Sequence, residues 1–295
     1  MLYNVNILLF KEIIVFKVVK KRQLNDLTYS MTILAPLVAQ NIMPGQFVMV
    51  MTDENSERIP LTISDFDKEK GEVTIVFQAI GASTIKLSNK NEGEEIAHFA
   101  GPLGAATELE NVKNACVIGG GVGCAIALPQ AKWLKNHGAQ VDLVAGFRNK
   151  EIVILEDEMI ENSTNCIICT DDGSYGVKGF VTNVLRENIE NGKLYDCVIA
   201  IGPIPMMRAV SDVTKEYGIK TIVSLNPIMI DGTGMCGGCR VKVGGQVKFA
   251  CVDGPDFDGH QVDFNELMIR NNMYKKQEAE AKEHMCRLFG GAENV

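Results

Sequence analysis

The feature that most restricts the fold is a regular alternation of apolar strands and helices between residues 111 and 226. The strand-like runs ACVIGGGVG, QVDLVAGF, CIICTDD, DCVIAIGP and KTIVSLN are apolar almost throughout. Between them lie CAIALPQAKWLKNHG, with a kink or a late helix start at Pro129, FVTNVLRENIENG and PMMRAVSDVTKEYG. Strands of this kind are typical of a parallel sheet covered by helices on both faces. The sequence therefore predicts an α/β domain over residues 109–226.

The chain before this domain has a different pattern. Short β-branched runs such as SMTILAP, GQFVMVMT and EVTIVFQAI are separated by Pro, Gly or Asp-rich turns. Several such strands in about a hundred residues predict a small antiparallel β-barrel over residues 1–108. The apolar start lacks a basic region and a small-residue cleavage site, and Lys11 interrupts it. We expect an edge strand or an upstream extension there, and not a signal peptide.

From residue 227 onward the alternation stops. A glycine-rich cysteine loop is followed by VKVGGQVKFACVDGP, which predicts a hairpin turning at Gly244 and Gly245. This segment is expected to form a small domain over residues 227–264. Residues 265–295, including YKKQEAEAKEHMCRL, predict a charged helix and tail.

Composition excludes several classes of function. With 46% hydrophobic residues and a net charge of −8, the chain can bury a core but lacks the basic face of a nucleic-acid binder. No apolar run reaches the roughly 20 residues that cross a bilayer. The nine cysteines are scattered, and the pair Cys166 and Cys169 lies in a strand-like run where their side chains point to opposite faces. Reduced thiols in a cytoplasmic protein are expected.

The most specific motif is DGTGMCGGCRVKVGGQVKFAC. Asp231, Cys236, Cys239 and Cys251 reproduce the C-x4-C-x2-C…C spacing of plant-type [2Fe–2S] loops, with aspartate in the first position. Ferric iron is hard enough to accept a carboxylate ligand. The alternatives are a zinc knuckle or a loop of free thiols, although zinc normally takes its last ligands from a second close pair. We predict a [2Fe–2S] cluster on these four residues.

A second motif, VIGGGVGCAI, places glycines 119–121 and 123 between a buried strand and a helix. Backbone can approach a phosphate closely at such a turn, and the helix N-terminus favours negative charge. The acidic residue that binds the ribose in NAD enzymes is missing, and LVAGFRNK offers Arg148 and Lys150 instead. The choice between NAD and NADP therefore stays open. Asp171 follows the third strand, where a ligand site and a turn in which Asp171 or Ser174 satisfies local backbone are both open. Met206 follows the Gly-Pro turn after the fourth strand, where a ligand site and core packing are both open.

In the β-rich part, ERIPLTISDFD and FQAIGASTIKL are candidate flavin contacts. Arg58 and Thr62 offer a charged donor and a hydroxyl, while Gly81, Ser83 and Thr84 lie at a predicted helix start suited to phosphate.

These motifs, in this order, resemble the ferredoxin reductase superfamily, and specifically its cluster-bearing branch. That branch includes the electron-transfer subunit of dihydroorotate dehydrogenase, the sulfide dehydrogenase β subunit and the small subunit of NADH-dependent reduced ferredoxin:NADP⁺ oxidoreductase. The resemblance covers about residues 15–275 and is carried by PGQFVMV, ERIPLTI, GGGVG, TDDGSYGVKGFVT, GPIPMM and the cysteine loop. Aspartate as first ligand, with FACVDGP and VDFNELM, is similar to the transhydrogenase and sulfide dehydrogenase type.

The resemblance implies a ferredoxin reductase-like fold: an FAD-binding β-barrel, a parallel-sheet NAD(P)-binding domain and a small [2Fe–2S] domain. It implies that Thr62 is catalytic, through a hydrogen bond near the flavin N5. The implied cofactor-binding residues are Arg58, Pro60, Leu61, Thr62, Ile63, Gln78, Gly81, Ser83, Thr84, Gly101, Gly104, Gly119, Gly120, Gly121, Val122, Gly123, Arg148, Asp171, Gly173, Gly202, Pro203 and Met206. The sequence departs from the wider superfamily at Ile201, where a cysteine often precedes Gly-Pro.

The implied activity is electron transfer between NAD(H) or NADP(H), FAD and the cluster. From the cluster, electrons would pass to a larger glutamate synthase-like iron–sulfur flavoprotein subunit. The two subunits would form a heterodimer that also exchanges electrons with ferredoxin. Sulfide dehydrogenase and dihydroorotate dehydrogenase subunits are the alternatives among enzymes. A non-catalytic zinc- or cluster-binding module is the alternative outside them.

Overall fold

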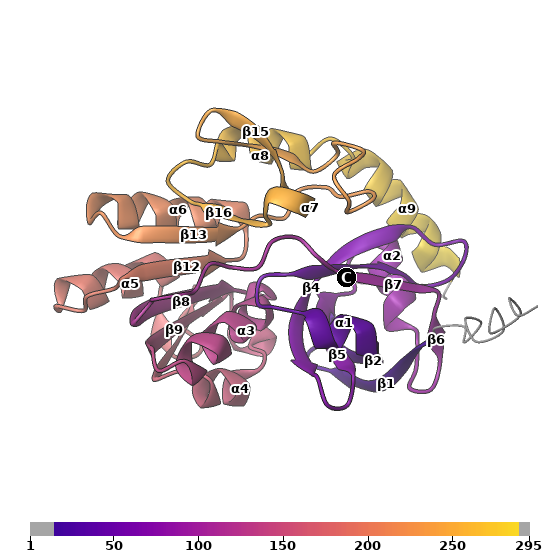
Figure 1. Cartoon of the computed structure of the whole chain (residues 1–295), viewed down its shortest axis with the longest axis horizontal. Coiled ribbons are helices and arrows are strands. Elements are labelled where there is room, and N and C mark those ends of the chain that lie inside the picture. Colours follow the sequence, from indigo (N-terminus) through magenta and orange to yellow (C-terminus); the bar gives the residue numbers. More distant parts are fainter. Residues whose placement is uncertain (1–14, 289–295) are drawn as a thin grey trace, which may run out of the picture.

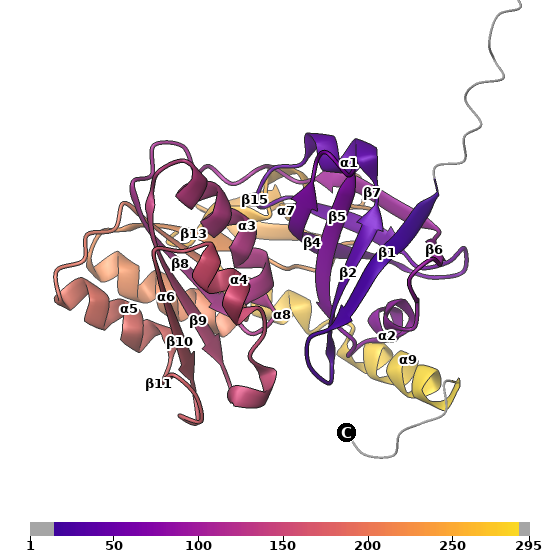
Figure 2. The same ribbon diagram turned by 90° about the horizontal axis from the view of Figure 1, so that it is seen from below.

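The computed structural model describes residues 15–288, so the expectation for the first ten residues lies outside the described part. Figure 1 shows a β-rich part on the right, an α/β part on the left and a C-terminal segment across the top of both. Figure 2, from below, separates the first two parts most clearly. In the described residues, no helix is long and apolar enough to cross a membrane.

The β-rich part is a curled antiparallel sheet of seven strands in the order β6-β1-β2-β5-β4-β3-β7. Its strands are β1 (Phe16–Gln23), β2 (Thr28–Leu34), β3 (Phe47–Met51), β4 (Arg58–Asp67), β5 (Glu72–Gln78), β6 (Glu95–Ile96) and β7 (His98–Leu103), and its helices are α1 (Pro36–Asn41) and α2 (Ala82–Ser88). Alternate residues of these strands, such as Met31 and Ile33, fill the interior. The predicted antiparallel barrel is confirmed as a half-barrel, because β6 and β7 remain the two sheet ends.

The α/β part is a sheet of seven strands in the order β11-β10-β9-β8-β12-β13-β16. Its strands are β8 (Asn114–Gly120), β9 (Gln140–Phe147), β10 (Asn165–Thr170), β11 (Val177–Lys178), β12 (Cys197–Ile201), β13 (Lys220–Ser224) and β16 (Asp256–Asp258). Its helical segments are α3 (Gly123–Asn136), η1 (Lys150–Ile152), α4 (Glu156–Glu161), α5 (Val181–Glu190) and α6 (Ile204–Glu216). All pairs are parallel except β13 with β16.

Two hydrophobic cores cover the two faces of this sheet. Helices α3 and α4 pack on one face, and α5 and α6 pack on the other. The two cysteines of the CIIC run contribute to different cores, Cys166 to the first and Cys169 to the second. Their predicted opposite orientation is therefore confirmed.

The first helix of the α/β part begins before Pro129, where one of our two predictions placed its start. Helix α3 starts at Gly123 and continues through Pro129, so a late start at the proline is wrong. Proline has no N–H for the carbonyl four residues back, here that of Ala125. The hydroxyl of Ser64 donates to this oxygen at 2.9 Å. A side chain of β4 thus replaces the missing helical hydrogen bond and ties the half-barrel to α3.

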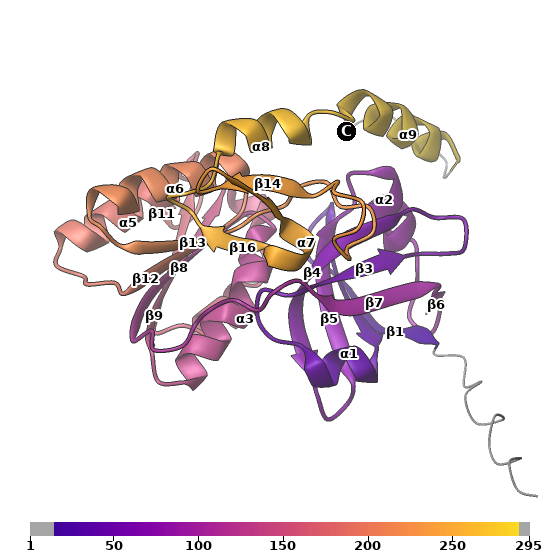
Figure 3. The ribbon, with the colours of Figure 1, turned by 45° about the horizontal axis from the view of Figure 1, so that its top comes forward.

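The C-terminal segment contains β14 (Arg240–Val243), β15 (Gln246–Phe249), α7 (Ala250–Asp253), α8 (Phe264–Asn271) and α9 (Lys275–Leu288). The predicted hairpin between β14 and β15 is confirmed. Strand β16 extends the parallel sheet, and the segment shares one core with α5, α6 and the half-barrel residues Phe47 and Met49. Helix α9 then lies beside α2, as Figure 3 shows.

Candidate functional site

The predicted cluster ligands lie in two pairs. In the first pair, the Cys236 N–H donates to Asp231 Oδ2 at 2.9 Å, and the Cys236 thiol also contacts this carboxylate. In the second pair, the sulfur atoms of Cys239 and Cys251 are 3.2 Å apart. A [2Fe–2S] cluster takes two protein ligands on each iron, so two pairs of ligands fit such a cluster. In residues 15–288, no three His, Cys, Asp or Glu side chains gather as they would around a single ion.

The two pairs differ in their surroundings. Cys239 and Cys251 are buried, while Cys236 is exposed. Burial, followed by the contact with Cys239, raises the pKa of the Cys251 thiol. The Thr233 N–H, which donates to Asp231 at 2.8 Å, is the largest cause that lowers the pKa of that carboxyl group. The loop therefore holds an ionised carboxylate near the surface and a sheltered pair of sulfurs beneath it.

Two arginines hold the loop from outside. The Arg240 guanidinium donates to the Gly237 carbonyl, and that of Arg270 donates to the Gly238 carbonyl, each at 3.1 Å. The Gly238 N–H lies 3.4 Å from the Cys236 sulfur. Positive charge and an N–H group beside a cluster sulfur both stabilise the reduced form. Sequence reasoning missed both arginines. Arg270 lies on α8, 32 residues from its partner, whereas Arg240 directly follows Cys239 and could have been found as a positive charge beside the cysteine loop.

Strand β4, which carries the predicted flavin residues, lies between the α/β part and the cluster loop. At one end Ser64 donates to Ala125 in the first turn of α3. On the other side, β4 pairs with β3, where Pro60 faces Met49. A Cβ on Gly232 would come within 2.7 Å of the Met49 side chain, so the cluster loop rests on β3. Strand β3 therefore lies between the Asp231–Gly232 turn and β4, the predicted flavin strand.

The other predicted flavin residues surround the same sheet. Arg58 to Ile63 lie on β4, Gln78 ends β5, and Gly81 caps α2. The Ser83 hydroxyl lies 3.3 Å from Glu57, which places the start of α2 beside Arg58. Thr84 is engaged in its own helix cap with Gly81. Gly101 and Gly104 pack against Val48 and Gly254, so protein contacts explain their lack of a side chain.

The predicted nucleotide residues gather at the carboxyl ends of the parallel strands. Strand β8 lies between β9 and β12, so the order in which successive strands are added reverses at the β8–β12 boundary, where ligands bind in folds of this kind. The loops after these two strands touch: a Cβ on Gly120 would meet Met206 at 2.5 Å, and one on Gly202 would lie 3.1 Å from Gly120. Gly121, with φ +56°, faces open space.

Arg148, Asp171 and Gly173 follow β9 and β10 at the same sheet edge, and Arg148 and Asp171 are exposed. The turn there is held by Asp172, whose carboxylate accepts from the Ser174 N–H and hydroxyl. Of the two residues expected in that local role, Ser174 donates both of these hydrogen bonds and Asp171 takes no part in them.

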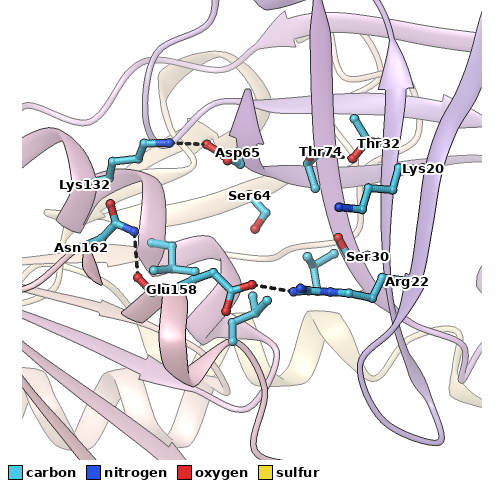
Figure 4. A pocket seen from close by; sticks show the side chains of 13 residues that line it. Lys20, Arg22, Ser30, Thr32, Ser64, Asp65, Thr74, Lys132, Glu158 and Asn162 are labelled. Atoms are coloured by element: carbon cyan, nitrogen blue, oxygen red, sulfur yellow. Dashed lines mark hydrogen bonds and ion pairs between the residues drawn. The ribbon is translucent and has the colours of Figure 1, made fainter. Parts of the chain in front are cut away.

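A separate cavity of about 200 Å³ lies between the half-barrel and helices α3 and α4 (Figure 4). Two ion pairs cross it, Arg22 with Glu158 at 2.6 Å and Lys132 with Asp65 at 2.8 Å. Ser30, Thr32 and Thr74 also line it. None of the predicted cofactor residues lines this cavity. It is part of the joint between the two parts and lies outside the predicted redox site.

Comparisons with known proteins agree with this geometry. Residues 226–263 match the family model described as the iron–sulfur cluster binding domain of dihydroorotate dehydrogenase B. The electron transfer subunit homolog of dihydroorotate dehydrogenase B (NAD(+)) from Thermotoga maritima is 43% identical, over 94% of this chain and 98% of that protein. A solved structure of NADH-dependent reduced ferredoxin–NADP oxidoreductase, described in terms of flavin-based electron bifurcation, is 40% identical with a TM-score of 0.87, over 92% of this chain and 97% of that one. The ferredoxin reductase of carbazole 1,9a-dioxygenase, 19% identical with a TM-score of 0.58 over 70% and 65% of the chains, shares the fold.

The fold and the paired ligands thus define an electron-transfer protein of the ferredoxin reductase type with an iron–sulfur domain. Within that class, the chain belongs to the family of dihydroorotate dehydrogenase B electron transfer subunits and their homologues. The predicted family, fold and iron–sulfur domain are confirmed. The roles of individual residues remain predictions.

Proposed function

We propose that this chain carries electrons between NAD(H) or NADP(H), FAD and a [2Fe–2S] cluster, as the smaller subunit of a ferredoxin:NADP⁺ oxidoreductase in the cytoplasm. The observation that carries the proposal is the place of β4. Ser64 of β4 contacts helix α3, whose start is the predicted nucleotide site. On its other side β4 pairs with β3, and Met49 of β3 contacts Gly232 of the cluster loop. A cofactor on this strand has the two other sites as its neighbours.

FAD supplies the chemistry that links two-electron hydride transfer to one-electron transfer, and the protein positions it. In the proposal, the turn of Gly119–Gly123 holds the nucleotide phosphates at the start of α3, and Thr62 donates a hydrogen bond at the reactive edge of the flavin ring. Asp231, Cys236, Cys239 and Cys251 hold the cluster. The domains 1–108, 109–226, 227–264 and 265–295 are proposed as the corresponding units.

A larger partner subunit would dock where the cluster loop meets solvent. Cys236, Ile230 and Met273 line a cavity of about 210 Å³ there, and the neighbouring Met235 is 88% exposed. Apolar side chains around an exposed cluster ligand suit a protein interface. We propose a glutamate synthase-like flavoprotein subunit as the partner, and we propose that ferredoxin exchanges electrons with the complex of the two subunits. The name of the Thermotoga maritima relative keeps a dihydroorotate dehydrogenase partner as the second candidate.

The role of Thr62 is tested by anaerobic stopped-flow reduction with NADH. The variant Thr62→Val keeps the shape of the side chain and removes its hydroxyl, whereas Thr62→Ser keeps the hydroxyl. Loss of one functional hydrogen bond should slow flavin reduction by roughly tenfold to a hundredfold in the valine variant. The serine variant should stay near the wild-type rate. Equal rates in all three proteins would remove Thr62 from the mechanism.

A further inference from the structure

A carboxyl group lies where the half-barrel, the α/β part and the C-terminal segment meet. Asp256 begins β16 and pairs with Ser224 of β13. Its Oδ2 accepts from the Thr107 hydroxyl at 2.5 Å and from the Gln130 amide at 3.2 Å. Thr107 belongs to the connection between the two large parts, and Gln130 to α3. The half-barrel closes the site, since a Cβ on Gly45 would come within 2.8 Å of Asp256 Oδ2.

Backbone hydrogen bonds also hold the two residues that precede Asp256. The Ala105 N–H donates to the Gly254 carbonyl at 2.6 Å, and the Leu225 N–H donates to the Pro255 carbonyl at 2.9 Å. Asp256 therefore follows two residues that are already bonded to the interdomain connection and to the end of β13. We call Asp256, Thr107, Gln130 and Ser224 the junction.

The hydrogen bonds of the junction depend on one proton. The Thr107 hydroxyl has a single hydrogen and two acceptors in reach, Asp256 Oδ2 and the Pro44 carbonyl, the latter at 3.2 Å. If Asp256 is protonated, it can donate to Thr107, which then donates to Pro44. If Asp256 is ionised, Thr107 and Gln130 both donate to Oδ2, and the Ser224 hydroxyl lies close enough to lower the pKa of the carboxyl group. The buried Oδ1 still has no hydrogen-bond partner among the described residues. A buried charge with an unsatisfied oxygen is costly.

No charge in the surroundings offsets this cost. The groups that face Asp256 are Thr107 from the connection, Gln130 from α3, Ser224 from β13 and the backbone of Pro44 and Gly45 from the half-barrel, and none is charged or titratable. Burial accordingly raises the pKa of Asp256 to about 6. This value brings the change of protonation into the range in which many proteins work.

We propose that Asp256 is a positioning residue: its protonated carboxyl group fixes the C-terminal segment against the two other parts, and loss of the proton loosens this junction. Because the segment carries the predicted cluster ligands, its position relative to the flavin strand changes with the state of one carboxyl group. The proposal itself concerns the fold and stands apart from the redox role.

Hydrogen exchange of the cofactor-loaded full chain, followed by mass spectrometry between pH 5 and 8, tests this proposal. The variant Asp256→Asn cannot ionise. The exchange rate of each protein over residues 254–258 is divided by the intrinsic rate for its own sequence at the same pH, so the ratio of the corrected rates isolates the effect of Asp256. Wild-type exchange should match the variant at pH 5 and exceed it several-fold by pH 8, with a midpoint near 6. A ratio that is constant with pH would overturn the proposal.

Two further variants sharpen the test. Asp258→Asn changes an exposed carboxylate in the same strand and should keep the wild-type pH dependence. Thr107→Val removes a donor that lowers the pKa of Asp256, so the midpoint should move to higher pH. If Asp256→Asn does not fold, an unmoved midpoint in Thr107→Val is sufficient to reject the proposal. These measurements do not depend on electron transfer, so their failure is distinguishable from failure of the proposed function.

Discussion

At the scale of single residues, the unusual predicted ligand is Asp231. Its carboxylate accepts from the N–H groups of Thr233 and Cys236, which orients it within the loop. A carboxylate is a harder donor than a thiolate, so the identity of this residue should set the potential of the cluster.

Substitutions at Asp231 test this expectation by potentiometric titration followed by electron paramagnetic resonance. Asp231→Cys should retain a [2Fe–2S] cluster with a potential shifted by at least about 60 mV, which is tenfold in a one-electron equilibrium. Asp231→Ala should bind less iron, because one ligand is missing. Wild-type spectra and potentials in both variants would exclude Asp231 from the ligand set.

The arginines beside the loop give a second prediction at this scale. Arg270→Gln removes a positive charge and keeps a donor for the Gly238 carbonyl. The reduced cluster carries an additional negative charge, so the potential of the cluster should fall in this variant. Arg208→Gln changes an arginine that donates to Asn265, outside the loop, and serves as the control. Equal potentials in both variants would mean that Arg270 has only a structural role.

At the scale of elements, the joint between β4 and α3 allows a quantitative test. Ser64→Ala should leave the buried Ala125 carbonyl unsatisfied and cost about 1–3 kcal/mol of unfolding free energy, measured by urea denaturation. In a Pro129→Ala background, residue 129 gains an N–H that can bond this carbonyl, so the same serine substitution should cost less. Equal costs in both backgrounds would contradict our explanation of the continuous helix.

The same joint shows what could and could not be predicted from sequence. The five longer parallel strands and helices α3, α5 and α6 were predictable because their hydrophobic patterns are local, whereas the short η1, α4 and β11 were not predicted. The start of α3 was not predictable, because the donor that makes Pro129 acceptable is Ser64, 61 residues before Ala125. Likewise, the spacing of the predicted cluster ligands is local in sequence, since Asp231, Cys236 and Cys239 lie in one loop and Cys251 follows the next hairpin. Their role as ligands stays a prediction. Asp256 could not be predicted, since its partner Thr107 is 149 residues away.

At the scale of the whole molecule, one polar contact between the parts, that of Asp256, is expected to depend on pH. The pKa of Asp256 rises from 3.8 to about 6 on folding, so the folded chain retains this proton between those values while the unfolded chain has lost it. The contribution of Asp256 to stability is therefore full below pH 3.8 and is lost as the pH rises to about 6. Two pH units correspond to about 3 kcal/mol.

Urea denaturation at a series of pH values measures this contribution as a difference between proteins. The unfolding free energy of Asp256→Asn, relative to that of the wild type, should increase by up to about 3 kcal/mol from pH 4 to pH 7. The other carboxyl groups are common to both proteins and cancel. A difference that does not vary with pH would show that Asp256 titrates normally in the folded chain.

The central claim is that one chain holds a flavin on β4 and a two-iron cluster as its neighbour across β3. The most direct measurement is an anaerobic NADH or NADPH titration of reconstituted protein, with iron and flavin analysis, absorption spectra and electron paramagnetic resonance on the same samples. We expect one FAD and two irons per chain, bleaching of the flavin bands and a signal from the reduced [2Fe–2S] cluster. A colourless protein that contains stoichiometric zinc and no flavin would contradict the claim.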